Sequence, residues 1–380
     1  MIYFDNAATT FPKPPSVRHK VITALTTLGG NPGRSGHDMS MKAAAAIYEV
    51  REKAAAMFGA SPENVIFTSN CTHSLNLAIK GIAEPFLRSG SNIHVIISDH
   101  EHNSVYRPVH ELTKRGLTYS IARIGDNDDE TVSNIEKLIT PKTSAVIMTL
   151  GSNVTGRLIP YRKIGAICRL HNISFIADGA QVCGVIPVNL TDDNINILCM
   201  PGHKGLYGIT GTGLLMTDGS RPIYHILEGG TGSTSAEPEQ TPFLPDELES
   251  GTLNTVGIMS VGAGIDFINY TGEGRIAAHE NMLCRLFING IRSNPGVTIY
   301  RNENAAYLPI VLFNINSMTP EEAAAYLNEN GFALRGGLHC SPLAHRANNT
   351  MPEGAVRFSP SYFNTPQEVA RLIRVIKQAT

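Results

Sequence analysis

The sequence predicts an α/β protein in which a large domain with a mostly parallel central sheet is followed by a smaller α+β domain. Its 380 residues exceed one ordinary domain and suggest two. Between residues 65 and 216, short apolar segments alternate with helical patterns, as in parallel strands joined by right-handed crossovers. After about residue 255 this alternation stops. We therefore expect a large domain at 15–255, a small domain at 256–380 and an N-terminal arm, 1–14, that packs near the small domain.

The large domain is expected to begin irregularly. A short strand at 5–10 leads into the arm, and a turn-rich loop at 31–37 precedes an alanine-rich helix at 41–58, which Gly59 ends. The strands then expected are 65–67, 93–98, 145–150, 173–177, 195–199 and 212–216, and the helices between them are 72–82, 106–115 and 162–171.

The small domain has clear helix-start signals. Glycines around a helical pattern at 258–268 suggest the joint between the domains. The stretch 319–322, Thr-Pro-Glu-Glu, combines an N-cap, a proline at the first helical position and an acidic third residue, and predicts a helix to about Glu329. The remaining expected elements are strands at 308–314 and 355–358 and a C-terminal helix that opens at Thr365 in the same way.

Composition and charge exclude several classes of function. The net charge of -2 offers no basic footprint for nucleic acid or an anionic membrane, and no apolar run is long enough to cross a bilayer. The balance of 42% hydrophobic and 17% charged residues leans weakly toward an oligomer. The N-terminus lacks the features of a signal peptide. Six cysteines without a CxxC pair indicate reduced thiols in a cytoplasmic protein, and we expect no metal site.

A lysine on a glycine-rich connection is the first candidate for chemistry. Lys204 lies in the stretch 200–208, Met-Pro-Gly-His-Lys-Gly-Leu-Tyr-Gly, between two expected strands. Glycines let the backbone bend and approach a ligand closely. A lysine at the end of a buried strand is desolvated, which lowers its pKa and suits it to Schiff-base formation. An ordinary loop lysine with its amine in water is the alternative.

Polar and ionisable side chains follow five of the expected strands. Ligands on open α/β sheets bind beyond the carboxyl ends of the strands. Each group alone is compatible with a solvated turn, but their convergence at one edge predicts a shared pocket. The groups lie at 68–73, 99–103, 151–153, 178–181 and 202–204.

Two of these groups suggest a particular coenzyme. Asp178 closes an apolar strand, where a carboxylate is costly unless it has a cationic partner, and the pyridinium nitrogen of pyridoxal phosphate (PLP) would supply one. A turn or N-cap acid is the alternative. Thr72 and His73 open a helix just after a strand, so backbone amides and the Thr72 hydroxyl are placed to hold a phosphate. An ordinary N-cap is the alternative there.

With these residues in view, the chain resembles, nearly end to end, the PLP-dependent cysteine desulfurases and selenocysteine lyases of the class V aminotransferase family. In this order and at these separations the matching motifs are highly specific. They are Tyr3-Phe4-Asp5-Asn6-Ala7-Ala8-Thr9-Thr10, Thr72 with Asn76-Leu77-Ala78, Glu101-His102, Ser152-Asn153-Val154-Thr155-Gly156, Asp178-Gly179-Ala180-Gln181, Gly202-His203-Lys204, Glu249-Ser250-Gly251-Thr252, Arg335-Gly336-Gly337-Leu338-His339-Cys340 and Val356-Arg357. The resemblance implies the fold type I of PLP-dependent transferases, with PLP as the coenzyme.

The resemblance also implies roles at individual positions. Lys204 would join PLP as a Schiff base, Asp178 would hold the pyridine nitrogen and Gln181 the ring hydroxyl. His102 would stack on the ring and move protons, and Asn153 would lie near the substrate and a cofactor oxygen.

Phosphate and substrate have their own implied partners. Thr72, His73 and His203 would bind the phosphate, joined by Thr252 from a neighbouring subunit, so a homodimer is the expected unit. Arg357 would clamp the substrate carboxylate, a task suited to its planar fork. The other implied substrate-binding residues are Asn6, Ala7 and Arg335.

Cys340 separates this branch from ordinary aminotransferases. Sulfur transfer requires a thiolate within reach of the substrate sulfur, on a segment that can swing out. The stretch 335–340 offers glycine mobility, and His339 beside the thiol offers a proton acceptor. A small buried hydrophobe is the alternative for Cys340. The implied reaction converts L-cysteine to L-alanine and leaves a persulfide on Cys340, for transfer to a protein acceptor that the sequence does not name.

Three positions depart from the family pattern. Pro201 stands where many relatives have a serine that touches the phosphate, and Cys71 and His73 differ from the commoner small or acidic residues. PLP binding is still expected, because several amides and Thr252 remain. The alternatives that stay open are a lyase for L-selenocysteine, an aminotransferase or other lyase of this fold that would not need Cys340, and a PLP-binding protein without turnover.

Overall fold

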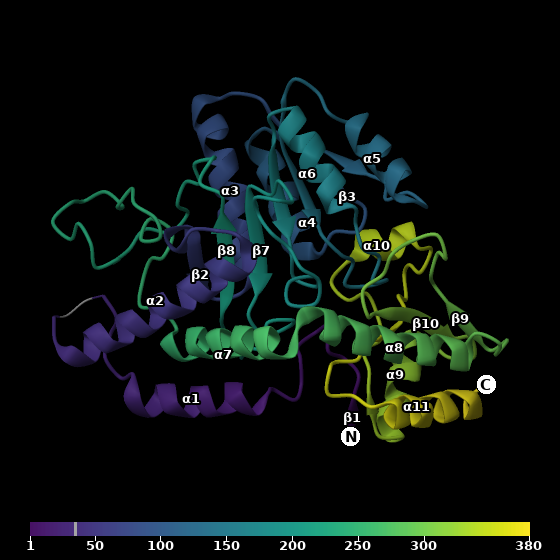
Figure 1. Cartoon of the computed structure of the whole chain (residues 1–380). Coiled ribbons are helices and arrows are strands. Elements are labelled where there is room, and N and C mark those ends of the chain that lie inside the picture. Colours follow the sequence, from purple (N-terminus) through teal and green to yellow (C-terminus); the bar gives the residue numbers. More distant parts are fainter. Residues whose placement is uncertain (34–35) are drawn as a thin grey trace.

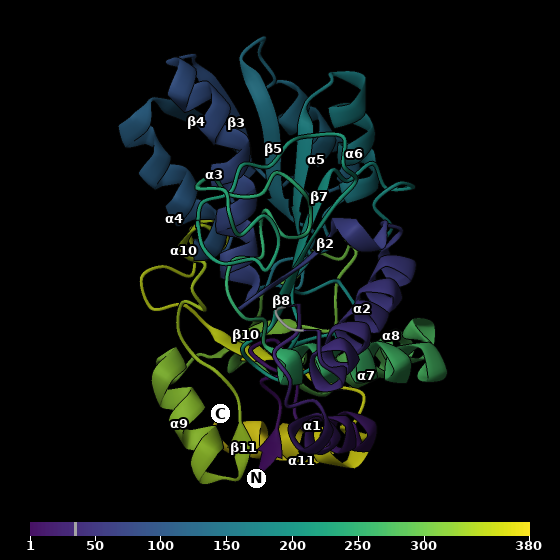
Figure 2. The same cartoon turned by 90° about the vertical axis from the view of Figure 1, so that its left-hand side faces the viewer.

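The computed structural model describes residues 1–33 and 36–380, which form a large α/β unit and a smaller α+β unit (Figures 1 and 2). Within the described residues the large sheet has seven strands in the order β2-β8-β7-β6-β5-β3-β4. All neighbouring pairs from β4 to β7 are parallel, and β8 runs antiparallel to β7 and β2. The mostly parallel sheet is therefore confirmed. Its strands are β2 (Val65–Thr68), β3 (Ile93–Ser98), β4 (Leu117–Ala122), β5 (Thr143–Thr149), β6 (Ser174–Asp178), β7 (Ile197–Pro201) and β8 (Gly213–Thr217).

Helices cover both faces of this sheet because successive strand side chains point to opposite sides. In β6, Phe175 and Ala177 join one apolar core and Ile176 joins the other. Helices α2, α6 and α7 pack in the first core, and α3 and α4 pack in the second. The helices of this unit are α1 (Pro15–Thr27), α2 (Asp38–Phe58), α3 (Cys71–Ser89), α4 (Asn103–Leu112), α5 (Asp128–Glu136), α6 (Tyr161–Leu170) and α7 (Thr255–Thr271), with 3₁₀ turns at Pro62–Asn64 and Thr113–Arg115.

The small unit packs helices on an antiparallel sheet of order β12-β10-β9. Helices α9 and α11 both begin with the capping box that the sequence predicted, at Thr319 and Thr365. Its strands are β9 (Val297–Ile299), β10 (Val311–Ile315), β11 (Phe332–Ala333) and β12 (Val356–Phe358), and its helices are α8 (Glu273–Ile291), α9 (Pro320–Glu329), α10 (Pro342–Ala347) and α11 (Pro366–Gln378). No helix in the described part of the chain is both long and apolar enough to cross a bilayer.

The N-terminal arm joins the small unit. Strand β1 (Ile2–Tyr3) pairs in parallel with β11, and Phe4 belongs to the small unit's core. The strand expected at 5–10 is wrong: Asn6 Oδ1 accepts from the amide of Phe11 at 3.0 Å, and this bond folds the segment into a turn. Both termini therefore lie at the small-unit end of the molecule (Figures 1 and 2).

Several element bounds differ from expectation. Strand β10 begins at Val311 rather than 308, because the amide of Leu308 bonds Gly156 of the large unit at 2.7 Å. Helix α4 begins at Asn103, three residues earlier than expected, because the side chain of His102 caps it. Helix α7 packs in the large unit's core through residues such as Ile265, so we propose a domain division near Gly272 rather than at 255/256.

Candidate active site

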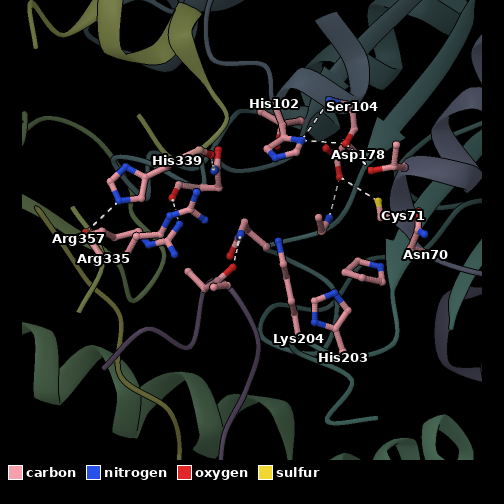
Figure 3. A pocket seen from close by; sticks show the side chains of 18 residues that line it. Asn70, Cys71, His102, Ser104, Asp178, His203, Lys204, Arg335, His339 and Arg357 are labelled. Atoms are coloured by element: carbon pink, nitrogen blue, oxygen red, sulfur yellow. Dashed lines mark hydrogen bonds between the residues drawn. The ribbon is translucent and has the colours of Figure 1, made fainter. Parts of the chain in front are cut away.

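A cavity of about 240 Å³ opens beyond the carboxyl ends of the large sheet, where the small unit and the arm meet it (Figure 3). The polar strand ends predicted to converge do so here. The large unit provides Thr72, His102, Asn153, Asp178, Gln181, His203 and Lys204, the arm provides Ala7, and the small unit provides Arg335, His339 and Arg357.

Lys204 is held by a tight loop after β7. A side-chain carbon on Gly205 would lie 2.2 Å from the carbonyl oxygen of Cys183, so only glycine fits there. The arm fixes the loop from the other side, since Thr10 Oγ1 donates to the Lys204 carbonyl at 2.7 Å and Lys13 Nζ to the His203 carbonyl at 2.8 Å. The Lys204 amine is buried, and burial lowers its pKa. This satisfies the condition for a nucleophilic amine.

Asp178 is a buried carboxylate at the last position of β6. Its Oδ1 accepts from the amide of Ala180 at 2.9 Å and from the thiol of Cys71 at 3.6 Å. Burial raises its pKa, and the charge of Lys204 opposes that shift. Among the described residues no cationic side chain makes an ion pair with it. The carboxylate thus lacks the cationic partner that a buried charge needs.

His102 has a defined tautomer. Its Nδ1 accepts from the backbone amide of Ser104 at 3.1 Å and lies 2.8 Å from the Ser104 hydroxyl, which contacts the Thr72 hydroxyl at 2.7 Å. An amide only donates, so neutral His102 has its proton on Nε2. Burial, followed by the charge of Lys204, lowers the pKa of His102 to about 4. Ser104 was missed by the sequence analysis, although its position two residues after an N-cap histidine is a usable signal.

Arg357 and Arg335 bring two positive charges to the pocket. Arg357 is buried and donates to Asp5 Oδ1 at 2.5 Å and to the carbonyl of Asn153 at 2.9 Å. Its Nε, also buried, has no hydrogen-bond partner among the described residues. Arg335 Nη2 lies 3.9 Å from Cys340 Sγ. A site with two guanidinium groups and an unused donor is suited to a carboxylate.

Cys340 stands at the pocket's mouth. Its side chain is exposed and lines an open groove of about 460 Å³, whose walls include His102, Thr72 and Ser104 of the main pocket. The Cys340 carbonyl accepts from the amide of Asn103 at 2.8 Å, which ties the segment to the start of α4. The thiol is therefore exposed on a groove that shares walls with the pocket, unlike a buried structural cysteine.

Some expected site residues lie elsewhere in the single chain. His73 folds back so that its Nδ1 lies 3.2 Å from Ser69 Oγ, outside the cavity. Thr252 is exposed, and its hydroxyl contacts Asn31 Nδ2 at 3.4 Å. Asn6 lines a smaller neighbouring cavity, with its amide engaged by backbone groups such as the Ser359 carbonyl at 3.0 Å. The roles of these three residues stay predictions.

A family model decides the relationship to known proteins. The Aminotransferase class-V model matches residues 2–372. The chain belongs to the class V aminotransferase family. Enzymes of this family depend on PLP, as the sequence resemblance implied.

This class V chain is similar to proteins named cysteine desulfurases. It is 29% identical to a probable cysteine desulfurase of Methanothermobacter thermautotrophicus, over 99% of this chain and 94% of that one. It is also 29% identical to the cysteine desulfurase IscS of Rickettsia massiliae, with coverages of 99% and 90%. The apo structure of a cysteine desulfurase from Thermococcus onnurineus NA1 superposes with a TM-score of 0.91 at 28% identity, covering 99% of this chain and 94% of that one. The predicted fold type I is confirmed.

The pocket of this class V enzyme fits PLP. The unpaired carboxylate of Asp178 matches a cationic ring nitrogen, and the buried amine of Lys204 matches an aldehyde. The Nδ1 atom of His203 is buried without a partner among the described residues. Helix α3 begins at Cys71, and Asn70, Cys71 and Thr72 line the cavity, so the start of this helix suits a phosphate. Pro201, the departure at the phosphate site, also lines the cavity. The Asn70 side chain caps the amide of His73 at 2.9 Å, so the phosphate would meet the amides that precede it.

Proposed function

We propose that this protein is a cysteine desulfurase that converts L-cysteine to L-alanine and retains the sulfur as a persulfide on Cys340. The proposal depends on one observation above all. An exposed thiol stands where the PLP pocket meets an open groove, 3.9 Å from an arginine that lines the pocket. An aminotransferase needs no such thiol. The relatives named cysteine desulfurases support the same reaction.

The arginines and Asp178 bind and orient in this scheme. Arg357 offers its unpartnered Nε to the substrate carboxylate, while Asp5 and the Asn153 carbonyl hold its other end in place. Asp178 would hold the ring nitrogen of PLP and offer it a carboxylate charge. PLP, when bound, withdraws electrons from the substrate's α-carbon and so makes its proton removable.

Protons and sulfur are then moved by side chains. Lys204, a buried amine with a lowered pKa, is suited to take the α-proton. His102 presents an Nε2–H to the pocket and can donate a hydrogen bond there. The Cys340 thiolate attacks the substrate sulfur, so an S–S bond forms and the C–S bond breaks. The electron pair stays with the substrate carbon that lost the sulfur, whose protonation gives the methyl group, and return of the α-proton from Lys204 completes alanine.

The test follows the coenzyme, alanine and sulfur separately. Purified protein is examined by absorbance and mixed with L-cysteine and a reducing thiol, and alanine and sulfide are quantified. The parent should release both in equal amounts, whereas Cys340→Ser should keep the coenzyme absorbance and release neither above background. Release of sulfide by Cys340→Ser at the parental rate would remove Cys340 from the scheme. A Lys204→Ala protein that kept the yellow absorbance would remove the covalent role of Lys204.

A homodimer is part of the proposal, because Thr252 lies outside the pocket of its own chain. Large apolar side chains are exposed on α1, on α2 and on the segment between β8 and α7, including Leu25, Tyr48 and Phe243, and a second copy would cover them. Mixing Lys204→Ala and Thr252→Ala chains tests this. A mixed dimer has one site with both Lys204 and a partner's Thr252, so activity should return on mixing. Failure of such complementation by dimers that do exchange would contradict the shared site.

Substrate range and location complete the proposal. No residue of the proposed site discriminates between sulfur and selenium, so turnover of L-cysteine and L-selenocysteine should be compared directly. Sensitivity to thiol alkylation separates both reactions from transamination. Cys340 delivers its sulfur to a protein acceptor through the open groove.

The free thiols of the described residues are compatible with a cytoplasmic location, which fractionation would test.

A further inference from the structure

The segment that presents Cys340 has an unusual backbone. His339 and Cys340 both have positive φ angles, 50° and 57°, which place two consecutive residues other than glycine in the left-handed region. Such residues cost free energy and persist only where the surroundings hold them. The structure must therefore contain a restraint at this turn.

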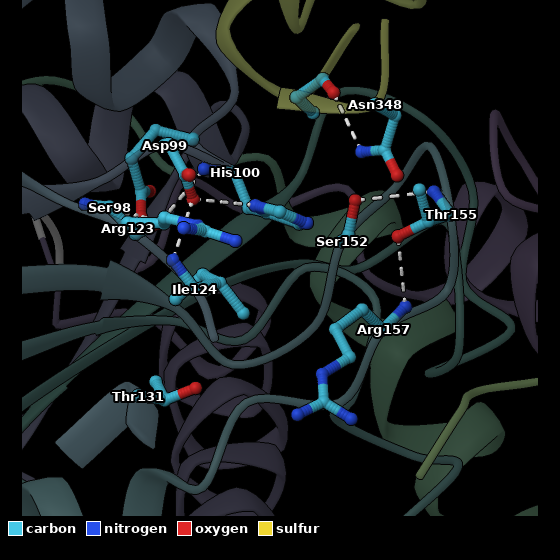
Figure 4. A network of polar contacts seen from close by, with 12 residues as sticks. Ser98, Asp99, His100, Arg123, Ile124, Thr131, Ser152, Thr155, Arg157 and Asn348 are labelled. Carbon is cyan, nitrogen blue, oxygen red and sulfur yellow. Dashed lines mark hydrogen bonds and ion pairs between the residues drawn. The ribbon is translucent and has the colours of Figure 1, made fainter. Parts of the chain in front are cut away.

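Part of the restraint is Asn153. Its Nδ2 donates to the His339 carbonyl at 2.9 Å, and its Oδ1 accepts from Ser341 Oγ at 2.7 Å, so both ends of the amide hold the turn. Asn153 is presented by a loop in which Ser152 Oγ accepts from the amide of Thr155 at 3.3 Å (Figure 4). Because its amide is occupied by the turn, Asn153 acts on the Cys340 segment as much as on the pocket it lines.

The rest of the restraint lies beneath the turn, in a buried chain of three side chains. His339 Nδ1 is 3.2 Å from His345 Nε2, and His345 Nδ1 is 2.8 Å from Thr350 Oγ1. Both imidazoles and the threonine are buried. At the other end of this hydrogen-bonded series, His339 Nε2 lies 3.1 Å from the carbonyl oxygen of Arg335.

That carbonyl fixes the direction of every bond. It only accepts, so His339 Nε2 must be protonated and His339 Nδ1, in the neutral ring, must accept from His345 Nε2. His345 Nδ1 then accepts from the Thr350 hydroxyl. The hydroxyl also lies 3.1 Å from the His345 carbonyl, but the bare Nδ1 of the neutral His345 ring is the nearer acceptor, at 2.8 Å. Burial lowers the pKa of His339 to about 2 and that of His345 to about 4, so both rings are neutral near pH 7.

We propose that His345 and Thr350 are positioning residues for sulfur transfer: with His339 they form a one-way hydrogen-bond chain that holds the left-handed turn and presents the Cys340 thiol. The proposal rests on the proposed function of Cys340. It also corrects the expectation that His339 accepts the thiol proton, since both of its ring nitrogens are engaged. His339 is then a structural link, and the thiol proton leaves toward solvent.

Thr350→Val tests the chain, with Thr350→Ser as its matched control. Valine keeps the shape but leaves His345 Nδ1 without a donor, whereas serine keeps the hydroxyl. We expect Thr350→Val to lower kcat for desulfuration about tenfold, with KM for cysteine and the coenzyme absorbance unchanged, and Thr350→Ser to stay within about twofold. Backbone hydrogen exchange at 335–341 should rise about tenfold in the valine variant alone.

Two readouts are independent of activity. Long-range ¹H–¹⁵N spectra of histidine-labelled protein should show His339 and His345 protonated on Nε2 and bare on Nδ1. A proton on His339 Nδ1, or unchanged exchange and kcat in Thr350→Val, would overturn the proposal. So would a valine variant in which KM and coenzyme binding worsen in proportion to kcat, because that pattern indicates general destabilisation. A parent protein could lack desulfurase activity and still show the stated tautomers and the stated hydrogen exchange. That result would overturn the proposed function but not the hydrogen-bond chain of His339, His345 and Thr350.

Discussion

The thiol of Cys71 lies 3.6 Å from Oδ1 of Asp178, where helix α3 begins and strand β6 ends. Both side chains line the PLP pocket, and Cys71 is one of the positions that depart from the family pattern. Burial raises the pKa of this thiol well above its ordinary value, so it remains protonated and able to donate. A hydrogen bond to the charged form of a carboxylate favours that form. Cys71 therefore supports the ionised Asp178 that a cationic ring nitrogen requires.

Removal of this thiol should weaken PLP binding. Cys71→Ala eliminates a hydrogen bond worth about 1 kcal/mol, so we expect the dissociation constant of PLP from the apoprotein to rise about fivefold. Cys71→Ser retains a donor and should stay near the parent value. Absorbance titration of the apoproteins with PLP measures both. Equal affinities for parent and alanine variant would show that the contact contributes nothing to coenzyme binding.

The ion pair between Asp5 and Arg357 should matter for stability and for substrate binding. Asp5→Asn leaves a buried guanidinium without its counter-charge, which should cost about 3 kcal/mol in free energy of unfolding and raise KM for cysteine. Asp129→Asn removes an exposed pair with Lys163 and should leave the free energy of unfolding close to the parental value. Urea unfolding and steady-state kinetics provide the comparison. Similar losses of unfolding free energy in the two variants would mean that the burial of Arg357 does not increase the contribution of its ion pair to stability.

Close packing of α7 on the Lys204 loop should make Gly264 intolerant of any side chain. A Cβ there would lie 1.8 Å from the carbonyl oxygen of Leu206, so Gly264→Ala should destabilise the fold by about 2 kcal/mol and weaken PLP binding. Gly274→Ala, in α8, meets no atom within 4 Å and should stabilise by about 0.5 kcal/mol. Thermal unfolding of both variants checks the contrast. A stabilised Gly264→Ala protein would contradict the described packing.

Glu280 should make stability depend on pH. It is buried in α8, and burial raises its pKa to about 8 from an ordinary 4.5, so the folded protein keeps a proton that the unfolded chain releases. Its contribution therefore falls as pH rises through this window, by about 1.4 kcal/mol per pH unit. Glu280→Gln stays neutral, so its stability advantage over the parent should grow between pH 5 and 8. Denaturant unfolding across this range measures the difference, and parallel curves would show that Glu280 is ionised in the folded state.

The regular part of the large sheet was predictable because its strands are continuous apolar runs. Strands β3, β5, β6 and β7 are buried on both faces and were found from sequence. Strand β4 was not, because it lies at the sheet edge with a polar, half-exposed pattern, Leu-Thr-Tyr-Ser-Ile-Ala. Helix α5 begins with Asp128, Asp129 and Glu130, which complement the helix N-terminus but hide any apolar stripe.

The residues of the candidate site were also only partly predictable from the sequence. Residues at the ends of predicted strands, such as Asp178 and Lys204, were found because parallel topology brings strand ends together. Thr350 and His345 were not, because their importance depends on a buried contact with His339 that no local pattern encodes. The contact of Cys71 with Asp178 was not predicted, because a lone cysteine has no sequence signal of its carboxylate partner.

The pairing of Asp5 with Arg357 joins positions 352 residues apart in the chain. During synthesis on the ribosome, the carboxylate therefore emerges well before its guanidinium partner. A nascent chain therefore cannot assemble its substrate clamp until Arg357 has been synthesised, and a product that stops short of Arg357 lacks that clamp however well its large sheet folds.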